Sequence, residues 1–309
     1  VDKIFDGNAE IVNNYDWTHN LDILTFLRTY GKFFNVNYMI NKETVKARLE
    51  SGISYAEFSY QILQALDFEH LYRTKGCQLQ VGGQDQWGNI TSGLELIRKM
   101  NGADSVAYGI TVPLVTKSDG TKFGKSESGA VWLAPKKTSP YQFYRSWINT
   151  SDQDVVKRLK QFTFLSKEET ERVIAEWEQA PHQRLAQKVL AKEITTLVHG
   201  EQAYEQALRV IEALFSGKVQ ELSLEEIEMG FEGIPSAEIT EDTNIIDALV
   251  MVKAASSKRE AREFIQNGAV LINGVQEKSL EFIISKDNAL GGKYTIVRRG
   301  KKNYYLLKH

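Results

Sequence analysis

The sequence has 309 residues, of which 42% are hydrophobic and 25% are charged, proportions that are ordinary for soluble globular proteins. This length is enough for two domains with sizeable cores. No apolar run approaches the roughly 20 residues that span a bilayer, and no secretory leader opens the chain, so we expect a cytoplasmic protein without a membrane partner. The single cysteine excludes an intramolecular disulfide framework and a metal site built from several thiolates.

Charge is distributed unevenly along the chain. The net charge is -2, but residues 240–309 hold 12 Lys and Arg against 8 Asp and Glu, whereas residues 1–239 hold 26 against 32. This asymmetry indicates that the C-terminal part meets a polyanion. A solvated basic face explains such a composition equally well.

The first part of the chain mixes helical and strand patterns. Apolar spacing predicts helices over residues 21–34, 43–50, 55–68 and 91–100. Residues 78–83, between the last two helices, read as a short strand that runs into two glycines. A strand, a glycine turn and a helix in this order are typical of an α/β nucleotide-binding domain at the carboxyl end of its sheet.

A polar stripe runs along the predicted helix 55–68. Tyr60, Gln64 and Asp67 stand at positions i, i+4 and i+7, which places them on one face of the helix. Together they could hold a small polar ligand, with Asp67 accepting a hydrogen bond from a hydroxyl or an amine. Amphipathic helices often carry a solvent-facing polar stripe, and the spacing alone favours that simpler interpretation.

A second polar group follows the predicted strand. Gln80 lies on the strand, and the segment from Gly82 through Gly83, Asp85 and Gln86 leads into the next helix. Glycines let a backbone approach a ligand closely, Asp85 can accept from two ribose hydroxyls, and Gln86 can both donate and accept. The segment lacks the G-x-G-x-x-G spacing of dinucleotide sites, so a plain strand-to-helix turn remains an alternative.

A lysine-rich loop forms the third group. Lys122 and Lys125 lie three residues apart among Gly, Ser and Thr, in the segment from Pro113 to Ser126. Two such lysines could close over phosphates, where positive charge matters most as negative charge develops on a leaving group. The segment does not match the Walker pattern G-x-x-x-x-G-K-[ST], and a solvated lysine loop is the alternative.

From residue 139 the pattern is helical, with helices predicted over 141–148 and 189–215. An acidic stretch interrupted by Gly and Pro indicates a linker. We therefore expect an α/β protein with four parts: a partial Rossmann-like domain over residues 1–135, an α-helical domain over 136–218, a linker over 219–242 and a small α+β domain over 243–309.

Helix caps and turns predict where the elements of this last domain begin and end. Ser257 with Glu260 three residues later is a capping box that predicts a helix start, and Asn267-Gly268 predicts its end. Asn273-Gly274 predicts a hairpin turn. The helix presents basic side chains on one side and is therefore a candidate RNA-binding surface. These side chains are Lys258, Arg259 and Arg262.

The sequence contains no residue pattern typical of metal sites or of hydrolases. None of the five histidines has a metal-binding spacing to a carboxylate or to another histidine, so we predict no protein-bound metal. The chain also lacks a G-x-S-x-G elbow and a catalytic cysteine pattern, which excludes the common hydrolases.

Taken together and in this order, the three polar groups resemble those of bacterial-type tyrosyl-tRNA synthetases, which are class I aminoacyl-tRNA synthetases. The resemblance continues through Thr138-Ser139-Pro140-Tyr141-Gln142-Phe143-Tyr144 and Leu197-Val198-His199-Gly200 to Tyr304-Tyr305, so it covers essentially the whole chain. It implies a Rossmann-like catalytic domain, a helical anticodon-binding domain and a small RNA-binding domain. It also implies that tyrosine is activated with ATP, accompanied by Mg²⁺, and is then transferred to tRNA(Tyr).

The resemblance also assigns roles to residues. Asp67 would meet the phenol hydroxyl of tyrosine, Tyr60 and Gln64 its amino group, and Gln86 its carboxylate, with Gln80 in the same pocket. The residues that would contact ATP are Gly83 and Asp85 at the ribose and Leu114 and Val115 at the adenine. Lys122-Phe123-Gly124-Lys125-Ser126 corresponds to the Lys-Met-Ser-Lys-Ser motif, and its catalytic side chains would be Lys122, Lys125 and Ser126, with Lys125 also binding ATP.

The chain contains no His-x-Gly-His string, which class I enzymes need near the N-terminus. The resemblance therefore implies an N-terminally truncated chain that is inactive by itself in tyrosyl-adenylate formation. Tyrosine-dependent ATP–pyrophosphate exchange by these 309 residues would contradict this expectation. Two alternatives remain: a non-catalytic RNA-binding protein of synthetase ancestry, and a tryptophanyl-type synthetase, against which Asp67 and the C-terminal module argue.

The family resemblance further implies a homodimer. Apolar and aromatic residues in the first part of the chain are candidate contacts, although core packing would explain them equally well. These residues are Phe26, Tyr30, Phe33, Phe34 and Tyr55.

Overall fold

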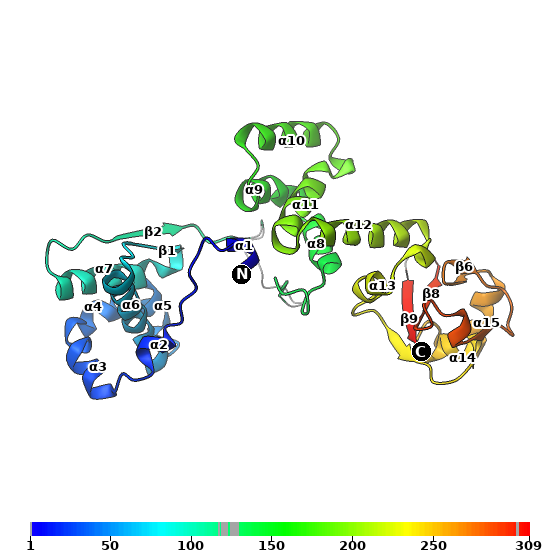
Figure 1. Ribbon diagram of the computed structural model, residues 1–309, viewed down its shortest axis with the longest axis horizontal. Coiled ribbons are helices and arrows are strands. Elements are labelled where there is room, and N and C mark those ends of the chain that lie inside the picture. Colours follow the sequence, from blue (N-terminus) through cyan, green and yellow to red (C-terminus); the bar gives the residue numbers. More distant parts are fainter. Residues whose placement is uncertain (1, 117, 119–122, 124–129, 301–302) are drawn as a thin grey trace. The chain divides into compact units, whose positions relative to one another are not determined.

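The computed structural model describes residues 2–116, 118, 123, 130–300 and 303–309. The chain divides into two compact units, one of residues 9–123 and one of residues 1–8 with 124–309 (Figure 1). In the part of the chain that is described, no helix combines the length and the apolar character needed to cross a membrane.

The unit of residues 9–123 is organised around two long helices that pack on each other. Ile62, Leu66 and Phe68 of the first helix and Ile90 and Leu96 of the second are buried. The elements of this unit are α2 (Tyr15–Thr18), α3 (Ile23–Thr29), η1 (Gly31–Phe33), α4 (Val36–Ile40), α5 (Glu43–Leu49), α6 (Tyr55–Lys75), β1 (Leu79–Gly83), η2 (Gln84–Gln86), α7 (Trp87–Asn101) and β2 (Tyr108–Val112).

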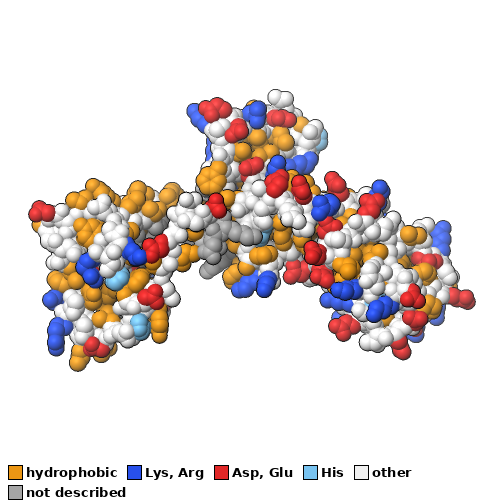
Figure 2. Space-filling model, viewed as in Figure 1, with side chains coloured by type: hydrophobic (Ala, Val, Ile, Leu, Met, Phe, Trp, Pro, Cys, Tyr) orange, Lys and Arg blue, Asp and Glu red, His pale blue; other side chains and the backbone are white. Residues whose placement is uncertain are grey.

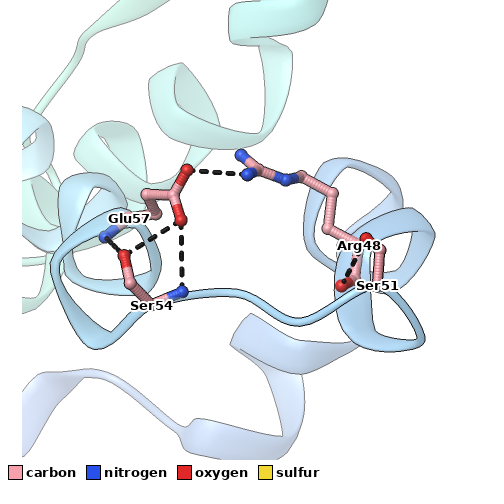
Figure 3. Close-up of polar contacts among 4 residues, drawn as sticks. All are labelled: Arg48, Ser51, Ser54 and Glu57. Carbon is pink, nitrogen blue, oxygen red and sulfur yellow. Dashed lines mark hydrogen bonds and ion pairs between the residues drawn. The ribbon is translucent and has the colours of Figure 1, made fainter.

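A capping box sets the start of α6, the helix that carries the polar stripe (Figure 3). The Ser54 hydroxyl accepts from the Glu57 backbone N–H, and the Glu57 carboxylate accepts from the Ser54 backbone N–H. Arg48 lies 2.7 Å from the same carboxylate. These hydrogen bonds, first those from Ser54 and then that from Arg48, lower the pKa of Glu57. The helix continues to Lys75, seven residues beyond the predicted end, and Gly76 closes it with φ 67°.

Strands β1 and β2 pair in parallel, with Gly83 opposite Val112, and α7 connects them. Close packing of α7 on this sheet requires a glycine in β2, because a Cβ at Gly109 would lie 2.5 Å from Ile90 Cγ2. This strand, helix and parallel strand confirm the predicted α/β class.

In the second unit, residues 140–216 are helical and bury a hydrophobic core that includes Phe143, Tyr144 and Leu190. We predicted a single helix over 189–215, and this is wrong. Gly200 adopts φ 91° and ends one helix where the next begins. The elements are α1 (Asp2–Phe5), α8 (Pro140–Ile148), α9 (Asp152–Phe162), α10 (Lys167–Gln179), η3 (Pro181–Gln183), α11 (Leu185–His199) and α12 (Glu201–Ser216).

The stretch 219–242, which we predicted to be a linker, instead holds regular structure. It contains η4 (Val219–Glu221), α13 (Leu224–Gly230) and β3 (Ser236–Glu238). Ile227 of α13 is fully buried, and Glu226 forms a 2.6 Å ion pair with Arg209 of α12. The linker prediction failed because Gly and Pro mark turns between short elements as readily as they mark linkers.

The C-terminal part is a five-stranded sheet of order β3-β9-β8-β5-β6 with two helices. Asn273 and Gly274 have φ 48° and 86° and form the predicted hairpin turn. The predicted helix also forms, with the Ser257 hydroxyl accepting from the Glu260 backbone N–H and with Asn267 at its end. The predicted capping box is incomplete, because the Glu260 carboxylate accepts from the backbone N–H and hydroxyl of Ser256 instead of from Ser257. The elements are β4 (Thr243–Asn244), α14 (Ile245–Met251), α15 (Lys258–Gln266), β5 (Val270–Ile272), β6 (Val275–Gln276), β7 (Ile283–Ile284), η5 (Lys286–Asn288), β8 (Tyr294–Arg299) and β9 (Asn303–Lys308).

Candidate active site

The polar stripe of α6 consists of one exposed and two half-buried side chains. Tyr60 is 66% exposed, whereas Gln64 and Asp67 are half-buried and hydrogen-bonded to other elements of the unit. A stripe that only faced solvent would not be tied to neighbouring elements in this way. The contacts therefore favour a built site over the simpler interpretation for Gln64 and Asp67.

Asp67 is held from both sides by residues more than 45 positions earlier in the chain. Trp17 donates its indole N–H to Asp67 Oδ1 at 2.8 Å, and Asn14 donates its amide to Oδ2 at 3.1 Å. An ionised carboxylate can accept about four hydrogen bonds, so room remains for a ligand hydroxyl. The patterns in the sequence did not point to Asn14 and Trp17, because neither has a short-range spacing to Asp67.

A second amide joins the two long helices beside this carboxylate. Asn89 of α7 donates to Gln64 Oε1 at 3.0 Å and lies 3.3 Å from Gln86 Oε1. Gln64 and Gln86, which we predicted from separate motifs, are thus brought together through a residue that we did not predict. Its position three residues after Gln86, on the first turn of α7, was the available signal.

The residues expected to bind adenosine also come together. A Cβ at Gly83 would lie 2.7 Å from Asp85 Oδ1 and 3.0 Å from Leu114 Cδ2, so a larger residue there would displace one of these side chains. The Asp85 carboxylate stands beside the start of α7, where Gln86 lies 3.4 Å from it. The arrangement offers an acceptor for ribose hydroxyls next to an apolar side chain.

Gln80 has a buried polar atom that remains to be satisfied. Its Oε1 is buried, and none of the described residues gives it a hydrogen bond. An unsatisfied buried acceptor costs about 1–3 kcal/mol, which a ligand donor would recover. This supports the prediction that Gln80 lies in a binding pocket.

Lys122, Lys125 and Ser126 lie outside the described residues. Phe123 is described, and its backbone N–H donates to Val115 O at 3.0 Å. This bond ties one residue of the lysine-rich loop to the segment that carries Leu114 and Val115.

Lys42 is a further residue near this site that we did not predict. Its Nζ donates to Gly88 O at 2.5 Å and to the Ser92 hydroxyl, both in the first turns of α7. It borders a small cavity of about 290 Å³ together with Asp85. Burial lowers the pKa of Lys42 to about 8, and the Glu95 carboxylate opposes this only in part.

We expect a pH-dependent stability contribution from Lys42. Since its pKa is lower in the folded chain than the usual 10.5, the unfolded chain binds the proton more tightly. The free energy of unfolding should therefore rise as pH increases from about 8 toward 10. Urea unfolding of the wild type and of Lys42→Met at pH 7.5, 8.5 and 9.5 measures this, with exposed Lys46→Met as the control. A wild-type minus Lys42→Met difference that does not change with pH would contradict the expectation.

The basic side chains of α15 are exposed and partly paired with acids. Lys258 Nζ lies 2.5 Å from Asp247 Oδ1, and Arg259 Nε lies 3.5 Å from Glu263 Oε1. Exposed pairs of this kind contribute only about 0–1 kcal/mol, so phosphates can compete for both cations. Arg262 is exposed on the same helix.

Two family models match the chain. The model described as tRNA synthetases class I (W and Y) matches residues 1–216, and the model of the tyrosine–tRNA ligase C-terminal domain matches residues 226–307. The first model includes both the tyrosine and the tryptophan types. The second model is specific to tyrosine–tRNA ligases and covers most of the sheet domain.

Curated relatives are similar over nearly the whole chain. A Bacillus cereus tyrosine–tRNA ligase is 56% identical over 98% of this chain and 73% of its own length, and one from Listeria monocytogenes is 56% identical over 99% and 74%. A solved mitochondrial tyrosyl-tRNA synthetase from Aspergillus nidulans is 33% identical, with a TM-score of 0.56 over 66% of this chain and 57% of that one. The chain therefore belongs to the tyrosine–tRNA ligase family of class I synthetases.

Proposed function

We propose that the chain is the larger part of a tyrosine–tRNA ligase, which as a whole enzyme activates tyrosine with ATP and transfers it to tRNA(Tyr). The observation that carries this proposal is the half-buried Asp67 carboxylate with room for one more donor, next to the Gln64–Asn89–Gln86 cluster, in a chain of this family. A carboxylate so placed accepts from a phenol hydroxyl, which phenylalanine lacks. Since the relatives that are 56% identical are bacterial ligases, we propose that it works in the cytoplasm.

The proposed reaction has two steps that need no covalent nucleophile from the protein. The tyrosine carboxylate attacks the α-phosphate of ATP and pyrophosphate leaves. A hydroxyl of the terminal ribose of tRNA then attacks the acyl carbon and AMP leaves. Asp67 and Gln64 would orient tyrosine, Gln86 its carboxylate, and Asp85 the ribose, so the contribution of these groups is positioning.

The lysine-rich loop would supply charge in the first step. Lys122 and Lys125 would stabilise negative charge on the departing pyrophosphate, with Ser126 beside them. Magnesium would accompany ATP as part of the substrate. Among the described residues, no three His, Cys, Asp or Glu side chains gather as they would around a metal ion.

We also propose that these 309 residues do not form tyrosyl-adenylate by themselves. Parallel sheets are normally covered on both faces. Here Val81 of β1 is 61% exposed and Ile110 of β2 is 50% exposed, and Figure 2 shows hydrophobic side chains at the surface over these strands. An open sheet face beside the site leaves ATP accessible to water and weakly oriented.

A chimera tests the proposed function. In the chimera, this chain is fused to the part of the Bacillus cereus ligase that its match does not cover. Tyrosine-dependent pyrophosphate exchange and charging of tRNA(Tyr) are then measured. We expect activity from the chimera and none from the 309 residues alone. Lys122→Ala and Lys125→Ala should each reduce exchange about 100- to 1,000-fold.

The controls separate the alternatives. A folded chimera that is active with tryptophan instead of tyrosine would establish the tryptophanyl type. An inactive but folded chimera that still binds tRNA would support a non-catalytic RNA-binding protein. Whichever of these functions is found, charge reversal of Lys258, Arg259 and Arg262 should weaken tRNA binding and reduce the salt dependence of that binding.

We further propose that the chain forms a homodimer through the apolar surface of residues 23–55. Tyr55 is 73% exposed and Ile23 is 72% exposed, as are large parts of Leu24 and Val36, and Figure 2 shows hydrophobic side chains around α3. Exposed apolar patches of this kind are typical of interfaces. Sedimentation equilibrium of the chain and of Tyr55→Asp tests the proposal, since a charge there should favour the monomer.

A further inference from the structure

His70 lies on α6 one turn after Asp67 and has no role in the proposed function. Its imidazole ring is stacked on the indole of Trp17, with 4.4 Å between ring centroids and 14° between ring planes. The same indole donates its N–H to Asp67. One helix face therefore holds Trp17 at two points, by a ring stack at His70 and a hydrogen bond at Asp67.

We propose that His70 is a positioning residue that acts through Trp17 to orient the Asp67 carboxylate, and so supports the choice of tyrosine over phenylalanine. The statement that His70 supports the choice of tyrosine rests on the proposed function. The part that concerns Trp17 stands on the ring geometry alone.

The position of Trp17 depends on these two contacts because its own helix provides little anchoring. α2 has only four residues, Tyr15–Thr18, buries none of them and lacks a side-chain cap. A helix this short is not stable by itself. The flat stack sets the orientation of the indole ring, and that orientation decides whether the N–H points at Asp67.

The direction of the hydrogen bond matters for the ligand. With Oδ1 occupied by Trp17 and Oδ2 by Asn14, the carboxylate plane is held in one orientation. If the indole swung away, the carboxylate would rotate, and its remaining acceptor positions would no longer be held toward the ligand. Phenylalanine has no hydroxyl, so its binding should not respond to that rotation.

The same segment contains a matched control. His19 stacks on Tyr15 with 4.9 Å between ring centroids and 20° between planes, and its ring nitrogens contact Tyr15 O and the Asn20 amide. Among the described contacts, His19 does not touch Trp17 or Asp67. His19→Ala thus removes a stacked imidazole near α2 without removing a support of the indole.

The first measurement uses the whole 309-residue chain without ligand. The indole N–H of Trp17 is followed by ¹⁵N NMR, with its signal assigned by Trp17→Phe and that of Trp87 in the same unit as an internal reference. In His70→Ala we expect the solvent exchange of the Trp17 N–H to increase about three- to tenfold, in line with the usual strength of an aromatic stack. His70→Phe, which keeps a flat ring, should restore slow exchange, and His19→Ala should leave it unchanged.

The second measurement is the binding of L-tyrosine and L-phenylalanine to the same variants by NMR titration. His70→Ala should lower the affinity for tyrosine about three- to tenfold and change that for phenylalanine less than about twofold. If the wild-type chain binds no tyrosine, the proposal that this chain contains a tyrosine pocket is contradicted. The solvent exchange of the Trp17 indole N–H then still tests whether His70 holds Trp17.

Three results would overturn the inference. One is unchanged exchange of the Trp17 N–H in His70→Ala. Another is an equal change of the Trp87 signal, which would mean that His70 only stabilises the unit. The third is a freed indole with an unchanged ratio of tyrosine to phenylalanine affinity, which would remove the link to substrate choice.

Discussion

Asp67→Ala should lower kcat/KM for tyrosine in the chimera by about 10- to 100-fold while changing that for phenylalanine little. Hydrogen bonds that involve a charged group contribute about 1.5–3 kcal/mol, and each 1.4 kcal/mol corresponds to a factor of ten. The substitution also leaves the Trp17 and Asn14 donors without their acceptor. Tyrosine- and phenylalanine-dependent pyrophosphate exchange measures both effects.

Asp67→Asn is the matched control for this prediction. Its amide oxygen can still accept from Trp17, but its amide nitrogen faces the Asn14 donor. We expect an intermediate loss for tyrosine with the fold retained. Equal decreases in kcat/KM for tyrosine and phenylalanine in Asp67→Ala would show that the carboxylate does not recognise the phenol hydroxyl.

Gly230→Val should destabilise the 124–309 unit more than any surface substitution. A Cβ at Gly230 would lie 2.5 Å from Val210 Cγ1, and both residues are buried between α13 and α12. Overpacking of this kind costs about 1–3 kcal/mol, and the branched side chain places the expected loss at the upper end. Hydrogen exchange of the α12 and α13 amides in increasing urea measures the free energy of unfolding.

A second-site change separates the clash from a general effect of valine in a short helix. Combining Gly230→Val with Val210→Ala removes the Cγ1 atom that is struck, so the double variant should lose less stability than the sum of the two single losses. Glu225→Val, at an exposed position of α13, should have only a small effect. Additive losses in the double variant would contradict the packing explanation.

The site was predictable to the extent that its residues lie in short motifs. The spacing of Tyr60, Gln64 and Asp67 placed them on one helix face, and α6 holds all three. The segment from Gly82 to Gln86 was expected as a glycine turn between strand and helix, and β1, η2 and α7 form it. The contacts that give these residues a common geometry were not predictable from spacing, because Asn14, Trp17 and Asn89 reach them across the fold.

One failed prediction concerns a segment whose neighbours are distant in sequence, and the other concerns the backbone conformation of a single glycine. Residues 219–242 look like a linker by composition, but α13 is held by Arg209 and β3 pairs in parallel with β9 at the end of the chain. The helix predicted over 189–215 contains a glycine, and only the backbone at Gly200 shows that the chain turns there.

The sequence by itself determined the polar stripe on one helix, the glycine turn and the lysine-rich loop, in this chain order, together with the Ser257 cap and the Asn273-Gly274 turn. Each of these features is built from steps of about four positions or fewer along the chain, so composition and spacing are enough. Only the tertiary structure decided which donors hold Asp67, which ring supports Trp17 and which helix pairs with Glu226. Those contacts join residues 17 to more than 50 positions apart, and they form because packing of the core brings distant elements together.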